Sequence, residues 1–261
     1  MNDPVIHSVD AQKNAPVNVD PMNDSDAGNT ETEYVMKVIA HMESDFSEKF
    51  GIPRQSGLVP ELRSRIVFEE TYRNPHALTG LDDFSHIWIL WGFSKAVRKG
   101  EGWSPTVTPP RLGGNKRMGV FATRSPFRPN PIGLSSVKLE KIELGTPEGP
   151  VLWVSGADLL DGTPIFDIKP YLAYTDAHTQ AVCGFADSVP YEELEVDFPP
   201  ELLEILPASK RAAAVGILRQ DPRPSYQHDP SRRYGVAFAG YDIRFYTDDH
   251  TLRVCEVVKL T

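Results

Sequence analysis

The stretch from Trp103 to Ser135 holds the residues best suited to chemistry, because charged and aromatic side chains are interspersed there with glycines and prolines. Its basic residues are Arg111, Lys116, Arg117, Arg124 and Arg128, and its aromatic residues are Trp103, Phe121 and Phe127. Guanidinium groups on loops of fixed shape suit phosphate oxygens, and neighbouring aromatic faces suit the stacking of splayed bases. A solvated band above ordinary core aromatics explains the same composition, so both interpretations stay open on the residues alone.

An acidic turn and a Gly/Pro loop are two further candidates. Asp158, Asp161 and Asp167 surround the turn, and their carboxylates could hold a ribose hydroxyl or an ammonium group. Capping of the turn by aspartate explains this segment better when it is taken alone. Residues 48–59 present Arg54 and Gln55, and an ordinary surface loop is the alternative there.

Several enzyme classes lack their motifs in this sequence. There is no G-x-G-x-x-G after a strand, no Walker loop, no G-x-S-x-G and no H-E-x-x-H. The seven histidines show no i, i+4 pairing, so we expect no metal site. Cys183 and Cys255 cannot form a disulfide framework or a four-ligand zinc site, and buried free thiols are expected.

The charge of the chain is unevenly distributed. The formal net charge is −9, yet residues 1–33 alone hold seven acids against one base. The segment from Lys95 to Lys138 holds nine bases against one acid, Glu101. The negative net charge argues against a nucleic-acid partner, whereas the clustering of the basic residues argues for one. No apolar run approaches a membrane span and the N-terminus has no signal-peptide pattern, which predicts a cytoplasmic protein.

Short apolar and β-branched runs, separated by Gly and Pro turns, must position these residues. The alternation of residues 137–144 predicts a half-buried antiparallel strand. The other runs that predict strands are 34–40, 87–91, 119–122, 151–154, 236–239 and 255–258. We therefore expect an all-β fold, closed or sandwich-like.

Helical patterns occur only near the C-terminus. They cover residues 201–206 and 209–220, with Ser209 as the expected N-cap and with Ala212, Val215 and Leu218 on one face. The expected organisation is a disordered acidic leader over residues 1–33, a β-barrel domain over 34–174 and a small α+β unit over 175–261.

Five segments together resemble the TrmO (TsaA-like) tRNA methyltransferase family. They are KFGIPRQSGLV (49–59), GLDDFSHIWIL (80–90), PTVTPPRLGGNKRMGVFATRSPFRPNPIGLS (105–135), DLLDGTPIFDIKPYL (158–172) and QDPRPSY (220–226). The family signature G-V-F-x-x-R-S-x-x-R-P-N occurs in full from Gly119 to Asn130. The resemblance covers about residues 34–261 and implies a closed β-barrel that binds S-adenosyl-L-methionine without a Rossmann fold.

The resemblance also implies the residues that contact this cofactor. By matching positions they are Pro53, Arg54, Gln55, Ser94, Lys95, Arg124, Leu134, Asp158, Leu159, Leu160 and Asp161. Relatives often carry His where this chain has Ser94. Arg54 or Arg124 would face the carboxylate of the cofactor, and Asp158 or Asp161 would face its ribose or ammonium group.

The implied reaction is methylation of N6 of N6-threonylcarbamoyladenosine at position 37 of tRNA, next to the anticodon. The residues expected to contact tRNA are Arg111, Lys116, Arg117, Arg128, Asn130, Arg219 and Arg223. Arg128 or Arg223 could read the threonyl carboxylate, while Arg219 and Arg223 could instead only brace the barrel. The residues alone do not identify the base that accepts the N6 proton, and the candidates are Asp161, Asp167 and His86.

The family tends to form homodimers with the cofactor pocket close to the interface, and we expect the same here. Two other functions compete with this assignment. A non-catalytic RNA-binding barrel would not bind S-adenosylmethionine, and a small-molecule methyltransferase would leave the basic segment unexplained.

Overall fold

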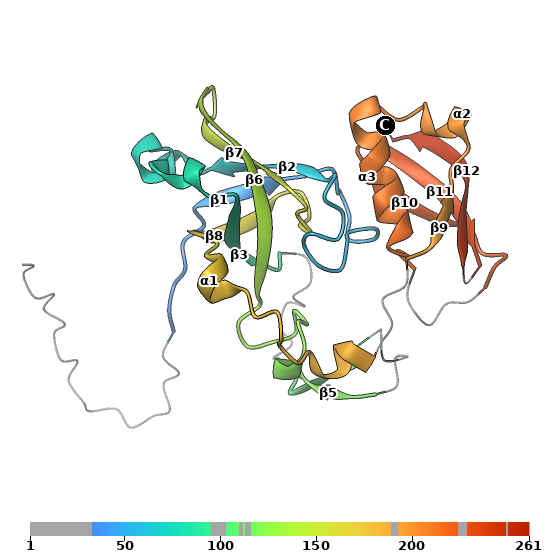
Figure 1. The fold of residues 1–261 in the computed structure, drawn as a ribbon, viewed down its shortest axis with the longest axis horizontal. Helices are drawn as coiled ribbons and strands as arrows, with labels where there is room; N and C mark the ends of the chain where they lie inside the picture. Colours follow the sequence, from blue (N-terminus) through green and yellow to red (C-terminus); the bar gives the residue numbers. More distant parts are fainter. Residues whose placement is uncertain are drawn as a thin grey trace, which may run out of the picture. The chain divides into compact units, whose positions relative to one another are not determined.

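A computed structural model describes residues 33–94, 103–109, 112, 116–188, 193–223, 229–248 and 250–260 of the chain (Figure 1). Residues Met36–Thr261 form one compact unit. The strands of its first part are β1 (Ala40–Glu43), β2 (Arg63–Phe68), β3 (His86–Gly92), β4 (Thr106–Val107), β5 (Met118–Gly119), β6 (Ile132–Thr146), β7 (Gly149–Ser155) and β8 (Thr163–Pro170). The remaining elements are α1 (Ala173–Asp176), β9 (Glu195–Asp197), α2 (Pro200–Leu203), α3 (Ala208–Arg219), β10 (Tyr234–Phe238), β11 (Tyr241–Thr247) and β12 (Thr251–Lys259).

The first part folds into a closed barrel. Its strands follow the order β1-β2-β7-β6-β3-β8, with β8 pairing back onto β1, and each pairing is antiparallel. Alternate side chains point inward, so that β2 buries Ile66 and Phe68 while β3 buries Ile87 and Ile89. The closed ring leaves no unpaired edge, and the interior is filled by side chains.

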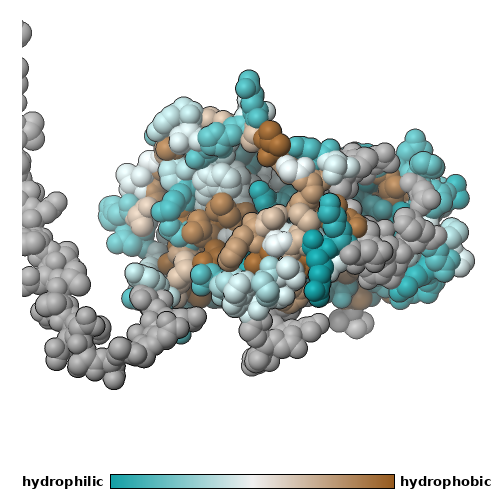
Figure 2. Space-filling model, turned by 90° about the horizontal axis from the view of Figure 1, so that it is seen from below, coloured by the Kyte–Doolittle hydropathy of each residue, from teal (hydrophilic) through white to brown (hydrophobic). Residues whose placement is uncertain are grey.

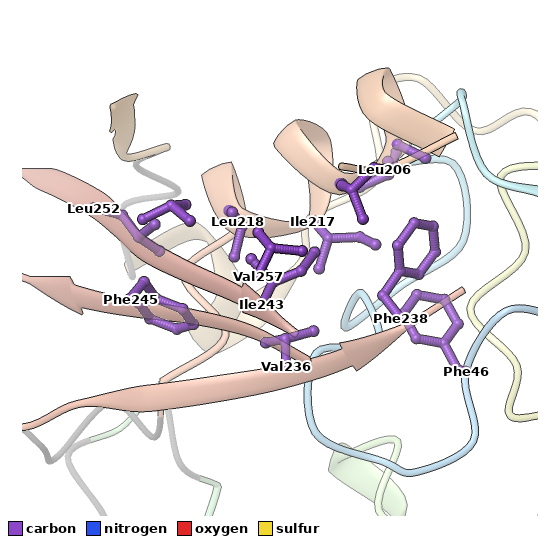
Figure 3. Packing of buried hydrophobic residues seen from close by; sticks show 14 of the residues in the cluster. Phe46, Leu206, Ile217, Leu218, Val236, Phe238, Ile243, Phe245, Leu252 and Val257 are labelled. Atoms are coloured by element: carbon purple, nitrogen blue, oxygen red, sulfur yellow. The ribbon is translucent and has the colours of Figure 1, made fainter. Parts of the chain in front are cut away.

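The C-terminal part is a sheet covered by a helix. The strands lie in the order β10-β11-β12-β9, and only the β12–β9 pairing is parallel. Helix α3 turns Ile217 and Leu218 toward Ile243 and Val257 of the sheet (Figure 3). The expected all-β fold with a closed barrel and a small α+β C-terminal unit is therefore confirmed.

The barrel loops share the hydrophobic core of the C-terminal sheet. Phe46, from the β1–β2 connection, packs against Phe238 of β10 with ring centroids 5.5 Å apart (Figure 3). Val59, Leu62 and Leu160 belong to the same buried cluster. The core of the barrel interior and this second core meet at neighbouring residues, because Leu159 is buried in the first and Leu160 in the second.

Some local expectations were wrong. Residues 34–39 are not strand. Ile39 forms backbone hydrogen bonds with Ile165 and Glu69, but the regular pairing of β1 begins only at Ala40, opposite Phe68 and Ile165. Val120–Ala122 forms a 3₁₀ turn after the short strand β5. In 236–239, the strand ends at Phe238, since Ala239 has a positive φ of 52° and turns the chain.

Helix α3 and the cysteines also differ from expectation. The N-cap of α3 is Pro207 rather than Ser209, and Ala212 is exposed while Ala213 and Ala214 are buried. Cys183 and Cys255 are free but exposed, the second because it alternates along β12 with the inward Val254. No helix in the described part of the chain has the length and apolar character needed to cross a membrane.

Candidate functional site

Three chain connections meet at one end of the barrel. They join β1 to β2 (residues 44–62), β3 to β6 (93–131) and β7 to β8 (156–162). Because neighbouring strands are antiparallel, the ends of β1, β3 and β7 lie beside the starts of β2, β6 and β8. Nearly all positions that the family resemblance assigns to the cofactor lie in these three connections. The exception, Leu134, is the third residue of β6 and lies at the same end.

Hydrogen bonds tie two of the connections together. The amide of Gly57 donates to the carbonyl of Gly156 at 2.8 Å, and the amide of Asp161 donates to the carbonyl of Phe46 at 2.9 Å. The Asp161 carboxylate accepts from the amide of Ser44 at 3.0 Å. The acidic turn and the Gly/Pro loop therefore form one structural unit, and Asp161 does cap backbone there.

Asp158 is the polar centre of this end of the barrel. Its partly buried carboxylate accepts a hydrogen bond from Ser135 Oγ at 2.7 Å, and Ser135 Oγ accepts one from Trp91 Nε1 at 3.0 Å. Burial raises the pKa of Asp158, while the bond from Ser135 and the charge of Arg124 oppose the rise. A carboxylate held this way in a polar cluster suits a cationic or hydroxyl ligand.

Sequence reasoning did not single out Ser135 and Trp91. Ser135 is 2% exposed and occupies an inward position of β6, and Trp91 comes from the neighbouring strand β3. A polar residue at an inward position of an alternating strand was the available signal, because a buried hydroxyl needs a partner.

The charge of Arg124 acts on Asp158, and hydrogen bonds link Arg124 to a second arginine, Arg54. Arg124 Nη1 donates to Gln55 Oε1, and Gln55 Nε2 donates to the carbonyl of Arg54. Arg54 Nη2 in turn donates to the carbonyl of Arg223 at 3.2 Å. Arg54 and Arg124 are both exposed, so this end of the barrel offers charged forks next to a carboxylate.

The remaining cofactor positions differ in exposure. Pro53, Leu159 and Leu160 are buried, and the two leucines serve the two cores. Ser94 is exposed at the end of β3, whereas Lys95 lies outside the described residues.

Leu134 borders an open pocket on the outer face of the barrel. Its side chain is 54% exposed. The pocket has a volume of about 340 Å³ and is lined by Trp88, Leu90, Leu134, Lys169, Thr175, Asp176 and His178. Figure 2 shows apolar side chains gathered beside hydrophilic ones on one face of the protein.

The connection from β3 to β6 carries basic and aromatic side chains at the surface. Lys116 and Arg117 are exposed next to β5. The rings of Trp103 and Phe121 stack with their centroids 6.1 Å apart and 27° between their planes. Trp103 is 51% exposed and Phe121 is 72% exposed. These aromatics are not ordinary core residues, so the solvated-band interpretation does not account for them.

The other expected tRNA contacts are differently placed. Arg128 donates to the carbonyl of Thr123 at 3.4 Å, and Asn130 is exposed. Arg111 lies outside the described residues. Arg219 is exposed on α3, whereas Arg223 is only 5% exposed.

Of the three candidates for the base, Asp161 alone lies in the three connections. His86 begins β3 and therefore lies at the opposite end of the barrel, with Nδ1 2.9 Å from Ser85 Oγ. Asp167 is within β8 and forms an ion pair with Lys169 at 2.9 Å. Across the described segments, no group of three or more His, Cys, Asp or Glu is arranged to hold a metal ion.

Comparisons with known proteins agree with this geometry. The profile of the tRNA-methyltransferase O N-terminal domain matches residues 41–177, and that of the TrmO C-terminal domain matches residues 191–260. The tRNA (adenine(37)-N6)-methyltransferase of Escherichia coli (strain K12) is 39% identical over 226 residues, which is 84% of this chain and 95% of that protein. A Pseudomonas aeruginosa protein named as a candidate S-adenosylmethionine-dependent methyltransferase is 41% identical over 234 residues, with 84% and 95% coverage.

A solved structure extends the likeness to the fold. The crystal structure of TrmO from P. aeruginosa superposes with a TM-score of 0.71 at 34% sequence identity, and the match covers 89% of this chain and 100% of that one. Both domain profiles, the sequence relatives and the shared fold agree. This chain belongs to the tRNA-methyltransferase O family.

Proposed function

We propose that this protein transfers a methyl group from S-adenosyl-L-methionine to N6 of adenosine 37 in tRNA, with N6-threonylcarbamoyladenosine as the form of the base that is modified. The observation that carries the proposal is the gathering of Arg54, Arg124, Asp158 and Asp161 at one barrel end. Their charges complement the carboxylate and the ammonium group of the cofactor, and a carboxylate can also accept hydrogen bonds from its two ribose hydroxyls.

The residues present fit such a cofactor. Asp158 has a carboxylate held by Ser135 and placed beside Arg124, so the cluster offers an anionic and a cationic partner side by side. The cofactor supplies a methyl group on a sulfonium, whose leaving group needs no protonation. The task of the protein is therefore alignment of the reacting atoms, and the connections tied together by backbone hydrogen bonds provide rigid support for it.

In this proposal the basic connection binds tRNA. Lys116 and Arg117 are free to approach phosphates at the surface, and the stacked pair Trp103–Phe121 offers a face for a base of the anticodon loop. Arg128, which donates one bond to a carbonyl, reads the threonyl carboxylate of the modified base. Asp161 is the best-placed acceptor for the N6 proton, since it is exposed within the acidic turn.

We further propose a homodimer in the cytoplasm, where tRNA is found. The pocket next to Leu134 supports a dimer, because the exposed Leu134, itself a cofactor position, and the half-buried Trp88 and Leu90 give it an apolar lining. Sedimentation equilibrium measures the mass of the particle, and a monomer at micromolar concentration would contradict this part of the proposal.

The test of the activity uses labelled S-adenosylmethionine and two tRNAs, one carrying and one lacking the threonylcarbamoyl group. Label is expected only in the first tRNA. Label in both tRNAs would support methyltransferase activity but contradict the threonylcarbamoyl form as the specific substrate. Binding of tRNA without any binding of the cofactor would favour a non-catalytic RNA-binding barrel.

A further inference from the structure

Arg223 has its guanidinium group engaged inside the protein. It is 5% exposed, and its Nε and Nη2 atoms donate to Asp221 Oδ1 and Oδ2 at 2.9 and 3.0 Å. Nη2 also donates to the carbonyl of Asp248 at 3.2 Å. A buried fork that is already paired would have to leave its partner to reach a phosphate, and breaking such a pair is costly. Contact of this side chain with RNA is thus disfavoured.

The backbone of Arg223 faces the barrel instead. Its carbonyl accepts the hydrogen bond from Arg54 Nη2 at 3.2 Å, and Arg54 precedes Gln55, which accepts from Arg124. A continuous set of contacts therefore runs from the C-terminal part, through the β1–β2 connection, to the charge that faces Asp158.

The turn that presents this carbonyl is held in one conformation. Asp221 follows α3 with a positive φ of 46°, a region that only Gly, Asn and Asp adopt readily. The same aspartate accepts from the amide of Arg223 at 3.2 Å and pairs with its side chain. The turn also borders a small cavity of about 110 Å³ that Pro53 and Arg54 line from the other side.

We propose that Arg223 is a positioning residue, which together with Asp221 fixes the turn after α3 so that its carbonyl orients Arg54 for the carboxylate of S-adenosylmethionine. This inference rests on the proposed function of the loop Pro53–Gln55. It gives the C-terminal part a role in cofactor binding, and it assigns Arg223 to that role rather than to tRNA.

The test compares Arg223→Lys and Asp221→Asn with the wild-type protein. Lysine keeps the charge but not the fork, and asparagine keeps the positive φ but not the ion pair. Each variant is expected to bind S-adenosylmethionine about tenfold more weakly by calorimetry, which corresponds to ~1.4 kcal/mol. The KM for tRNA and the salt dependence of tRNA binding should not change. The double variant should bind the cofactor no more weakly than either single variant, because both substitutions break the same Arg223–Asp221 ion pair.

A residue that read RNA would behave differently. Arg223→Lys would then raise the KM for tRNA, and Asp221→Asn, which removes an acid, would tighten tRNA binding. Either result, or wild-type cofactor affinity in both variants, overturns the inference. Arg233→Lys is the matched control, since the side chain of Arg233 is 50% exposed and pairs with Glu256 of β12 at the surface of the C-terminal sheet.

Two further readouts separate the possible failures. Thermal melting shows whether a variant is folded, and Asp221→Asn decides the question if Arg223→Lys does not fold. Failure of the wild-type protein to bind S-adenosylmethionine would contradict the proposed function itself. Wild-type affinity for this cofactor in both variants would contradict only the positioning role.

Discussion

Asp158 combines burial, a hydroxyl partner and a neighbouring guanidinium, and these three surroundings act on its pKa in opposite directions. Burial dominates, so the carboxyl of the folded protein holds its proton more tightly than the unfolded chain does. A group whose folded-state pKa is raised contributes stability at low pH, and that contribution is lost as the pH rises through the raised pKa.

Asp158→Asn should therefore gain stability relative to the wild type as the pH rises above the ordinary aspartate value of 3.8. Asparagine does not titrate but still accepts from Ser135. Urea unfolding of both proteins from about pH 4 to about pH 8 measures the difference.

Asp176→Asn is the control with the opposite sign. Hydrogen bonds from the amide of Leu172 and from Trp88 Nε1 lower the pKa of Asp176. The stabilising effect of the Asp176 carboxylate is present above the ordinary pKa of 3.8 and is lost as the pH falls through the lowered pKa, so urea unfolding of this variant is followed below pH 3.8. A stability difference for Asp158→Asn that is constant with pH would contradict the raised pKa.

The sequence predicts a site residue when that residue belongs to a recognisable motif. It does not predict residues that reach the site only through the pairing of distant strands. The acidic turn indicated Asp158, whereas Ser135 and Trp91 reach it only because β3 and β6 pair in the closed barrel. Arg223 shows the converse, since its positive charge suggested a surface role and the ion pair with Asp221 buries it.

At the scale of elements, the β1–β2 connection depends on Gly51. Its φ is +95°, and an added Cβ would lie 2.5 Å from Val236 Cγ1 in β10. Gly57, in the same connection, also has a positive φ of +81° but has nothing within 4 Å. Only the first glycine is thus required by a close approach to the C-terminal sheet as well as by its backbone conformation.

We expect Gly51→Ala to cost about 2–4 kcal/mol, of which ~1 kcal/mol is the left-handed conformation and the rest the clash. Gly57→Ala should cost only about 1 kcal/mol. Urea unfolding measures both, and Val236→Ala should relieve part of the first cost. Equal costs for the two glycines would show that the contact with Val236 is absent.

The basic connection between β3 and β6 gives a second element-scale prediction. If Lys116 and Arg117 contact phosphates, Lys116→Gln and Arg117→Gln should each lower the slope of log K against log salt for tRNA binding by about one. Filter binding at several salt concentrations measures the slope. Lys141→Gln, on β6 with a side chain that is 60% exposed, is the control and should leave the slope unchanged.

The elements themselves were partly predictable. Alternation identified β6, because one face of that strand is buried and the other is not. Apolar composition alone overestimated strand at residues 34–39 and at Val120–Ala122, since a strand also needs a partner. The barrel closure that brings three connections together depends on pairings between distant segments, such as β1 with β8, which no local pattern specifies.

At the scale of the molecule, the shared core predicts joint unfolding of the barrel and the C-terminal sheet. Phe238 is 1% exposed and packs on Phe46 of the barrel connection. Phe238→Ala should destabilise the protein by about 3–5 kcal/mol.

The tryptophans make this prediction measurable, because all four lie in the first part of the chain, at positions 88, 91, 103 and 153. Tryptophan fluorescence and circular dichroism should give one transition that shifts together in the variant. Tyr174→Ala, at an 87% exposed position, serves as the control. A fluorescence transition that stays at its wild-type position would mean that the two parts unfold independently.

The antiparallel barrel has a second end, which carries the short β6–β7 turn at residues 146–149 and the β2–β3 connection (Figure 1). None of the residues assigned to cofactor or RNA lies in that turn. A fluorophore, an affinity tag or a fused domain attached to this turn would lie at the opposite end of the barrel from the proposed cofactor site. The turn is therefore the natural place to tether the protein for single-molecule or immobilised measurements of tRNA modification.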